Sequence, residues 1–272
     1  MERGNDFEVI AEIGWNFMGD MSLAKDMVRA AKLCGAHYAK FQYWNQEKLN
    51  SGVWDTDGRR EIYKKAQLDS TKICTLIQYC EEFEINFLIS CFNREDAEFL
   101  KNLGVDGIKI PSHEIANFPL HQFAANNFKK CFVSLGAGSF TEIKNAVKIY
   151  NDTGVDWVGM HCVSAYPCPM DKVNLPKIND LGKFVKKLGF SDHTSEVVTP
   201  ALAYLLGVRT FEKHFTTDNS LPGRDNKFAL TPDTFKEMII HLEKAQQANI
   251  FHGTEASDLE SDTISNYRGR WG

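Results

Sequence analysis

Residues 7–42 read FEVIAEIGWNFMGDMSLAKDMVRAAKLCGAHYAKFQ: a short apolar run, an amphipathic run and a second short apolar run. Short apolar runs favour strands, so we expect strands at Phe7–Ile13 and Ala36–Gln42. An N-cap residue, Asp20 or Ser22, precedes the helical run, and a glycine ends it. A helix between two strands supplies the long connection that parallel pairing needs, so this stretch predicts a β–α–β unit.

The same alternation continues along the chain. We expect further strands at Asn86–Cys91, Gly107–Ile110, Cys131–Leu135, Trp157–Cys162, Lys187–Ser191 and Val208–His214. We expect further helices at Thr71–Phe83, Arg94–Leu103, Pro119–Asn126, Thr141–Thr153, Leu175–Leu181, Glu196–Leu206 and Thr231–Ala248. Eight such units predict an α/β fold of the (β/α)8 TIM-barrel class, as a single domain over residues 1–248. An open doubly wound sheet is the alternative, but its GxGxxG fingerprint is absent after the first strand.

Two segments fall outside this pattern. Tyr43–Ser70 is a long polar stretch after the second strand, and Asn249–Gly272 forms a tail after the last helix. Long loops without structure are usually functional or mobile. We therefore expect these two segments to be the ones able to fold over the end of the barrel.

Composition excludes several classes of protein. The 272 residues are 43% hydrophobic and 25% charged, which rules out a disordered chain, a collagen and a coiled coil. The net charge of −5 argues against nucleic acid or anionic lipid as a partner. No apolar run reaches the roughly 18 residues of a membrane span, and the N-terminus lacks an apolar signal core. Seven cysteines without a CxxC pair suggest no disulfide framework. We expect a cytoplasmic protein without nucleic-acid or membrane partners.

Each predicted strand ends in a polar residue, at the end of the barrel where (β/α)8 enzymes have their active sites. The two lysines among them predict an anionic ligand, phosphate or carboxylate, with serines as hydrogen-bond donors. A single lysine is more often a surface residue and a single serine a turn residue, so the prediction rests on the whole set. A closed barrel brings the set to one end: Glu12, Lys40, Ser90, Lys109, Ser134, His161, Ser191 and His214.

Two histidines lie at the ends of consecutive strands. His193 in FSDHT follows the seventh strand, and His214 in FEKHFT ends the eighth. Adjacent strand ends bring both imidazoles within reach of one divalent ion, and imidazole suits manganese, iron, cobalt, nickel and zinc. Glu12 adjoins the eighth strand in a closed barrel and can add a carboxylate. Two hydrogen-bonded core histidines are an equally weighted alternative, and we expect His161 to be structural.

Several motifs resemble the sialic acid synthase family, the N-acetylneuraminate synthases. The family pattern AEIGxNHxG, a helix and then GAxxxKFQ is similar to residues 11–42. The likeness continues through IKIPSHE, VSLGAGS, HCVSAYPCP, GFSDHT, FEKHFT and LPGRD. These motifs occur in order over nearly the whole chain, and the combination SDHT…EKHFT…GxD is specific to the family.

The resemblance implies a transferase that condenses phosphoenolpyruvate with an aldose such as N-acetylmannosamine and releases phosphate. It implies that His193 and His214 hold a divalent metal, manganese first, with magnesium or cobalt as alternatives. Glu12 and Glu114 match acidic residues near the reacting groups, and either can assist the addition of water. Matching positions imply substrate contacts at Lys40, Ser90, Lys109, Ser112, Ser134, Ser164, Tyr166, Ser191 and Asp225.

The chain departs from the family pattern at three motifs. Phe17 replaces the histidine of AEIGxNHxG, Ser164 replaces the asparagine of HCxNxYP, and PSHE replaces GSGE. Family members often continue into an antifreeze-like domain whose arginine reaches the sugar of a partner subunit, which makes a homodimer a candidate assembly. Residues 260–272 resemble only the linker to that domain. We therefore expect an intact phosphoenolpyruvate and metal half, with weak aldose binding or a preference for a smaller or less polar aldose.

Two other functions stay open at this point. One is condensation of phosphoenolpyruvate with a different aldose or an aldose phosphate, as in the deoxy-octulosonate phosphate synthases. The other is a catalytically weakened barrel that binds phosphoenolpyruvate or a sugar as a scaffold or regulator.

Overall fold

The computed structural model describes residues 5–272, so the first four residues of the expected domain 1–248 lie outside it. Parallel strands close into a barrel in the order β1 to β8. The last strand also pairs with the first, with Glu8 opposite Thr210, so the sheet has no free edge. The predicted TIM barrel is confirmed, and the open sheet is excluded. The strands are β1 (Glu8–Gly14), β2 (Tyr38–Gln42), β3 (Asn86–Ser90), β4 (Gly107–Ile110), β5 (Lys130–Ser134), β6 (Asp156–His161), β7 (Leu188–Asp192) and β8 (Thr210–His214).

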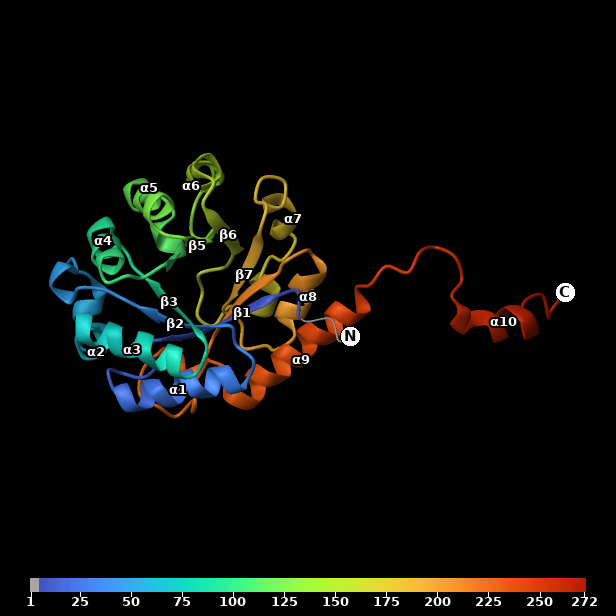
Figure 1. The fold of residues 1–272 in the computed structure, drawn as a ribbon, viewed down its shortest axis with the longest axis horizontal. Coiled ribbons are helices and arrows are strands. Elements are labelled where there is room, and N and C mark those ends of the chain that lie inside the picture. Colours follow the sequence, from blue (N-terminus) through green and yellow to red (C-terminus); the bar gives the residue numbers. More distant parts are fainter. Residues whose placement is uncertain (1–4) are drawn as a thin grey trace.

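Helices surround the strands (Figure 1). Asp20 caps the first helix, because its carboxylate accepts from the backbone N–H groups of Ser22 and Leu23. No helix within residues 5–272 has the length and apolar character needed to cross a membrane. The helices are α1 (Met21–Leu33), α2 (Arg59–Ala66), α3 (Ser70–Glu82), α4 (Arg94–Asn102), α5 (Phe118–Asn127), α6 (Phe140–Thr153), α7 (Lys177–Leu181), α8 (Thr199–Leu205), α9 (Pro232–Ala248) and α10 (Ser261–Asn266).

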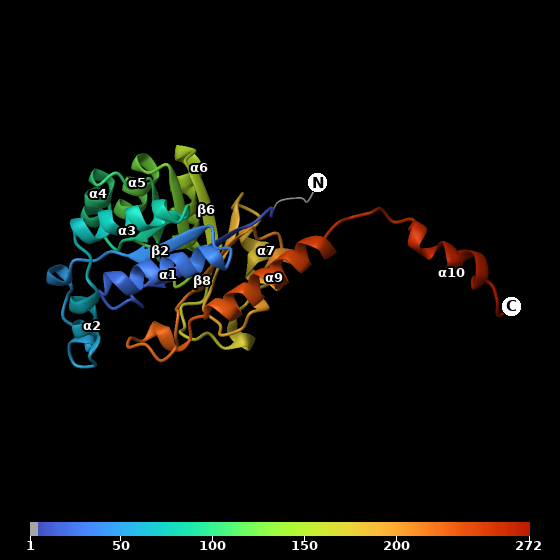
Figure 2. The same cartoon turned by 60° about the horizontal axis from the view of Figure 1, so that its bottom comes forward.

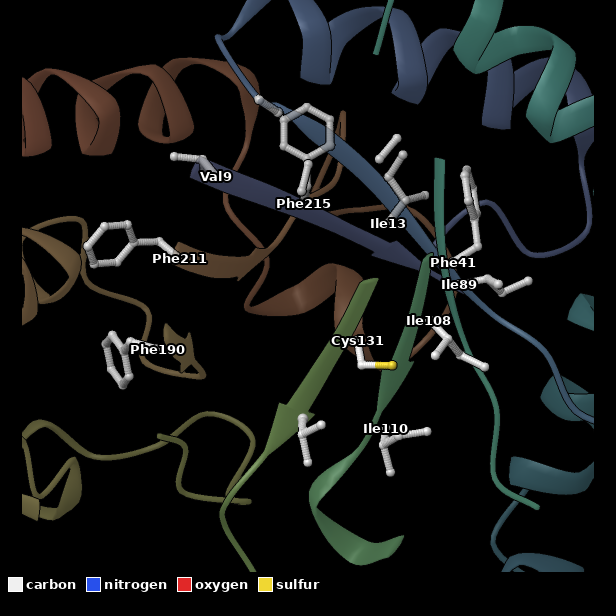
Figure 3. Packing of buried hydrophobic residues seen from close by; sticks show 14 of the residues in the cluster. Val9, Ile13, Phe41, Ile89, Ile108, Ile110, Cys131, Phe190, Phe211 and Phe215 are labelled. Atoms are coloured by element: carbon white, nitrogen blue, oxygen red, sulfur yellow. The ribbon is translucent and has the colours of Figure 1, made fainter. Parts of the chain in front are cut away.

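The apolar core has two layers, one on each face of the barrel. Outward-facing side chains fill the space between strands and helices, and Figure 3 shows Phe41, Ile108, Phe211 and other members of this layer. A smaller layer fills the barrel itself. Because both faces of every strand are buried, the strands are rich in apolar residues without simple alternation. The inner layer comprises Ile10, Leu88, Phe132, Val158 and Met160.

The N-terminal end of the barrel is closed by Lys130, which reaches across from β5. Its ammonium lies 2.8 Å from the Glu8 carboxylate on β1 and donates to the Tyr38 hydroxyl on β2 at 2.9 Å. The same ammonium stands over the Phe132 ring at 5.0 Å from its centroid. These contacts tie three strands together at the end opposite the predicted site.

The structure corrects three expectations about the irregular segments. The stretch 43–70 is not an unstructured loop, because it contains α2 and two short 3-10 helices. The helix expected at Glu196–Leu206 begins only at Thr199. The tail contains α10, is exposed throughout residues 249–272 and leads away from the barrel in both views (Figures 1 and 2). In this structure the tail therefore does not cover the end of the barrel.

Candidate active site

The inner-layer residues show which side chains of each strand point into the barrel, and the next inward side chain lies nearer its C-terminal end. Side chains alternate along a strand, so the next inward position lies two residues beyond each inner-layer residue. On β1, β2, β3 and β5 this position belongs to residues predicted from the sequence. They are Glu12, Lys40, Ser90 and Ser134, and all four are buried.

Two lysines and two glutamates form one buried network at this end. Lys109 Nζ lies 2.6 Å from Glu212 Oε2, and Lys40 Nζ lies 2.7 Å from Glu12 Oε2. Lys40 Nζ is also 3.6 Å from Glu212 Oε1, which links the two pairs. Gln42 Nε2 donates to Glu12 Oε1 at 2.5 Å. The two predicted lysines are therefore neighbours, and each has a carboxylate beside it.

The two glutamates have opposite protonation behaviour. Burial opposes the ionisation of Glu212, but Lys109 and Lys40 outweigh it and hold the pKa of this carboxyl well below its ordinary value. Burial raises the pKa of Glu12 to about 7, although Lys40 acts against it. At neutral pH Glu212 is therefore ionised, whereas Glu12 is present in both its ionised and its protonated form. Sequence reasoning missed Glu212, although its position two residues before His214 on one strand puts both on the inward face.

The serines occupy two neighbourhoods. Ser191 Oγ donates to Glu212 Oε1 at 3.1 Å. The hydroxyls of Ser134 and Ser112 face the Cys162 thiol, which also neighbours Lys109. These three serines therefore surround the Lys109 side of the network. Two others have protein partners: Ser164 Oγ lies 2.5 Å from Ser112 Oγ, and Ser90 Oγ donates to the Phe41 carbonyl at 3.4 Å.

His193 and His214 lie side by side, with ring centroids 5.7 Å apart. His193 Nδ1 donates to the Val163 carbonyl at 2.7 Å, so its Nε2 carries the lone pair, and this atom lies 3.4 Å from Ser191 Oγ. His214 Nδ1 is buried and has no hydrogen-bond partner among the described residues. Burial lowers the pKa of His193 to about 4 and that of His214 well below 6.5, so both rings are neutral at pH 7.

This arrangement fits a divalent metal. A neutral imidazole with one nitrogen fixed by a carbonyl and the other free is the usual form of a metal-binding histidine. A buried imidazole nitrogen without a partner is costly unless a ligand or ion satisfies it. Within residues 5–272, His, Cys, Asp and Glu side chains form no metal-binding group of three or more, so the protein offers a two-histidine arrangement.

Tyr166 and Asp225 stand beside the histidine pair. The Tyr166 ring lies 4.2 Å from the His193 ring and 5.9 Å from the His214 ring, between centroids. Asp225 Oδ2 lies 3.6 Å from His214 Nδ1. Burial raises the pKa of Asp225 to about 6. The structure thus gathers four of the predicted residues at the ends of β6, β7 and β8.

Two predicted residues lie apart from this centre. Glu114 follows β4, and its carboxylate accepts from Asn117 at 2.8 Å instead of joining the lysine–glutamate network. His161 points outward, with Nε2 bonded to the Val173 carbonyl and its ring stacked on Phe190, which corrects its placement among the residues at the barrel end. As expected, this histidine is structural.

The expectation for Phe17 is also corrected. This ring is buried in the outer core layer and packs edge-on against Phe41, whose side chain points away from the barrel interior. An apolar ring at residue 17 therefore removes no hydrogen-bonding group from the centre of the site.

A second ion pair, also missed from the sequence, holds the turn that carries His193. Lys213 Nζ lies 2.6 Å from Asp192 Oδ2 and donates to the carbonyls of Thr194 and Glu196. The Lys213 and Asp192 side chains are almost completely buried on the outer side of the barrel. Each is the chain neighbour of one of the two histidines. In sequence, EKH and SDHT show two charged residues inside apolar strands, which is the signal that could have identified the pair.

A sequence model of the NeuB family matches residues 27–252. The chain belongs to the NeuB family. It is an enzyme of that family, a phosphoenolpyruvate-condensing nonulosonic acid synthase, and NeuB-family enzymes are generally metal-dependent.

Three similar proteins have three different names. N,N'-diacetyllegionaminic acid synthase of Legionella pneumophila is 32% identical over 255 residues, covering 88% of this chain and 72% of that protein. Pseudaminic acid synthase of Campylobacter jejuni is 30% identical over 271 residues, covering 95% and 78%. The crystal structure of N-acetylneuraminic acid synthetase from Leptospira borgpetersenii matches with a TM-score of 0.87 at 29% identity, covering 96% and 91%. The family therefore contains synthases named for three different nonulosonic acids.

Proposed function

We propose that this NeuB-family synthase condenses phosphoenolpyruvate with an N-acetylmannosamine-type aldose at the C-terminal end of its barrel, and that a divalent metal assists. One observation carries the proposal. A buried pair of lysines, Lys40 and Lys109, lies next to two neutral histidines: His193, whose Nε2 faces Ser191, and His214, whose Nδ1 has no hydrogen-bond partner among the described residues. The lysines can bind the negative charges of phosphoenolpyruvate, and the histidines can hold a metal that polarises the aldehyde carbonyl. The reaction needs these two functions side by side.

The lysine–glutamate network is suited to a ligand that carries several negative charges. Phosphoenolpyruvate brings a carboxylate and a phosphate, which compete with Glu12 and Glu212 for Lys40 and Lys109. We therefore propose that phosphoenolpyruvate binds to the two lysines together with Ser112, Ser134 and Ser191.

The proposed reaction forms one carbon–carbon bond and one carbon–oxygen bond, from water, and it breaks the carbon–oxygen bond to phosphate. Carbon three of phosphoenolpyruvate attacks the aldehyde carbon, and the aldehyde oxygen takes up a proton. Water then adds to carbon two, and phosphate leaves with the former bridging oxygen. Holding both substrates in the reacting geometry supplies much of the acceleration. A divalent ion held by His193 and His214, manganese with magnesium or cobalt as alternatives, supplies Lewis acidity toward the aldehyde oxygen.

Glu12 is the carboxylate that we assign to the water step. It is buried within the network and titrates near neutral pH, as a general base requires. Glu114 accepts from Asn117 on its own loop and lies outside the lysine–glutamate network. A cytoplasmic location and a homodimer stay predictions.

Phosphate release from phosphoenolpyruvate tests the proposal. We expect release with manganese that depends on the aldose, across a panel of aldoses that includes N-acetylmannosamine and an aldose phosphate. Lys40→Met and Lys109→Met should each weaken phosphoenolpyruvate binding by about ten- to a hundredfold, because a charge-assisted contact is worth roughly 1.5–3 kcal/mol. Lys129→Met, an exposed lysine near the N-terminal end of β5, is the control. Unchanged binding in both variants, or release that ignores the aldose, contradicts the proposal.

A further inference from the structure

A buried histidine and a buried tyrosine link two outer helices to the turn that follows β4. His121 lies on α5 and Tyr150 on the neighbouring α6 (Figure 1), and neither side chain is exposed. The Tyr150 hydroxyl lies 2.9 Å from His121 Nδ1, and His121 Nε2 lies 3.1 Å from the backbone carbonyl of Glu114. The three groups therefore form one continuous chain of hydrogen bonds from α6 to the turn.

The carbonyl at its end fixes the direction of both bonds in this chain. A carbonyl can only accept, so His121 Nε2 carries the hydrogen and donates to Glu114. His121 Nδ1 then holds the lone pair and accepts from the Tyr150 hydroxyl. Burial keeps the ring in this neutral form, because it lowers the pKa of His121 to about 4. The ring therefore has one tautomer and one orientation.

The turn between β4 and α5 receives the histidine bond at Glu114. Residues Ser112–Glu114 form a short 3-10 helix. The Glu114 carbonyl has two donors, the backbone N–H of Asn117 at 2.9 Å and the ring of His121. The first bond closes the turn on itself, whereas the second ties the turn to the buried pair of His121 and Tyr150. The pair therefore fixes where the turn lies against the helices outside the barrel.

Ser112 connects this turn to the proposed phosphoenolpyruvate site. Its side chain is buried, its hydroxyl lies 2.5 Å from Ser164 Oγ, and it also faces the Cys162 thiol beside Lys109. Ser112 is two residues before Glu114 in the same turn, so a shift of the Glu114 carbonyl moves the serine as well. Small displacements of groups that bind a substrate cost affinity and rate.

We propose that His121, held by Tyr150, is a positioning residue that sets the place of Ser112 and thereby the affinity for phosphoenolpyruvate. The proposal rests on the proposed function, in which Ser112 binds that substrate. Both members of the pair belong to helices outside the barrel, so they act through the turn and not by contact with the ligand. A pair that served packing alone would change stability without changing the binding of any ligand.

Titration of phosphoenolpyruvate with manganese and without an aldose tests the proposal, because binding is then measured without turnover. His121→Leu keeps most of the side-chain volume and removes both bonds. We expect its dissociation constant to rise by about fivefold, the effect of one net hydrogen bond. His121→Gln should restore most of the affinity, because the new amide can donate to the same carbonyl. His37→Leu is the matched control and should bind like the wild type, since His37 accepts from the Val9 N–H at the opposite end of the barrel.

A double-mutant cycle shows whether His121 acts through Ser112. We expect His121→Leu to weaken binding by about fivefold in the wild type but by less than about twofold in the Ser112→Ala background. A general loss of structure would weaken binding equally in both backgrounds. The combined variant His121→Leu/Tyr150→Phe removes both polar side chains of the pair, so no buried hydroxyl is left without a partner and we expect it to fold. It should show the same loss of affinity as His121→Leu.

Hydrogen exchange measures the turn without any ligand. The Ile115 amide donates to the Ser112 carbonyl at 3.2 Å. Its exchange should be faster in His121→Leu than in the wild type and should slow again in His121→Gln. Unchanged exchange in His121→Leu would show that the histidine does not fix the turn, and the proposal would be wrong.

Three binding results also overturn the proposal. They are unchanged affinity for phosphoenolpyruvate in His121→Leu, an equal loss in His37→Leu, and a loss that is the same with and without the Ser112 hydroxyl. Failure of the proposed function gives a different result. A wild type that binds phosphoenolpyruvate but releases no phosphate with any aldose refutes that function and leaves the role of His121 standing. Normal release together with unchanged affinity in His121→Leu refutes only the positioning role.

Discussion

Glu212 joins the two lysines of the site into one network. It lies 2.6 Å from Lys109 and 3.6 Å from Lys40, and it accepts from Ser191. Two buried ammonium groups without a shared carboxylate would repel each other in a medium of low dielectric. The residue therefore holds the two lysines together, and its contacts with them must weaken when an anion binds to the same lysines.

Replacing Glu212 by Gln keeps the shape of the side chain and removes its charge. We expect the unfolding free energy at pH 7 to fall by about 3 kcal/mol, because the buried lysines lose their counter-ion. Saturating phosphoenolpyruvate should restore more stability to this variant than it adds to the wild type, since its charges replace the missing carboxylate. Chemical denaturation with and without phosphoenolpyruvate measures both effects.

Glu8→Gln is the control for this prediction, because Glu8 pairs with Lys130 at the opposite end of the barrel. Its stability should gain no more from phosphoenolpyruvate than the wild type does. Equal gains for both variants would show that Glu212 does not share its lysines with the ligand.

His121 links pH to stability through burial. Its ring lies between the Tyr150 hydroxyl and the Glu114 carbonyl, and burial lowers its pKa from 6.5 to about 4. As pH falls from 6.5 to 4, the unfolded chain binds a proton that the folded chain does not. Stability is therefore lost over this range, by up to about 3 kcal/mol.

The variant His121→Gln removes this proton uptake. Between pH 6.5 and 4.5 its unfolding free energy should fall less steeply with acid than that of the wild type, by up to about 1.4 kcal/mol per pH unit. His252→Gln changes an exposed histidine of the tail and should keep the wild-type slope. Identical slopes in the wild type and the His121 variant would reject the assignment.

At the scale of elements, sequence patterns predicted regular structure well where burial dictates it. Strands such as Gly107–Ile110 were predicted with the observed bounds, because both faces are buried and the runs are apolar. Helix α2 was missed because its sequence, RREIYKKA, is mostly charged and buries only Ala66. The candidate site was predicted where strand ends carry it, as at Lys40 and His214. The network of Glu212 and the pair of Asp192 with Lys213 depend on contacts between distant segments, which no local pattern shows.

The pair of Asp192 with Lys213 joins strands β7 and β8 behind the two histidines. Lys213→Met should lower the unfolding free energy by about 3 kcal/mol, because Asp192 is left buried and unpaired. It should also weaken manganese binding at a temperature where the variant is folded, since the turn that holds His193 loses its anchor. Calorimetric titration with manganese measures the second effect.

Lys187→Met breaks an exposed pair with Asp156 on neighbouring strands and is the matched control. We expect a change in stability below about 1 kcal/mol and no change in manganese affinity. If Lys213→Met loses stability but binds manganese like the wild type, the pair supports the fold without positioning the histidines.

At the scale of the whole molecule, the tail does not pack against the barrel. The strands close through β1 and β8, and α9 is the last helix packed against the barrel. Residues 249–272 are exposed and lead away from it (Figure 2). Shortening the chain to end at Asn249 should change the midpoint of thermal unfolding by no more than about 2 °C, because little buried surface is lost. A larger drop would show that the tail packs on the barrel in solution.

The most direct test of the central claim follows the bridging oxygen of phosphoenolpyruvate. Condensation at this site breaks the bond between carbon two and that oxygen, so substrate labelled there with oxygen-18 should yield labelled phosphate. The account predicts labelled phosphate only when manganese and an aldose are both present, and little of it from His193→Ala or His214→Ala. Unlabelled phosphate, or labelled phosphate formed without any aldose, would contradict the account.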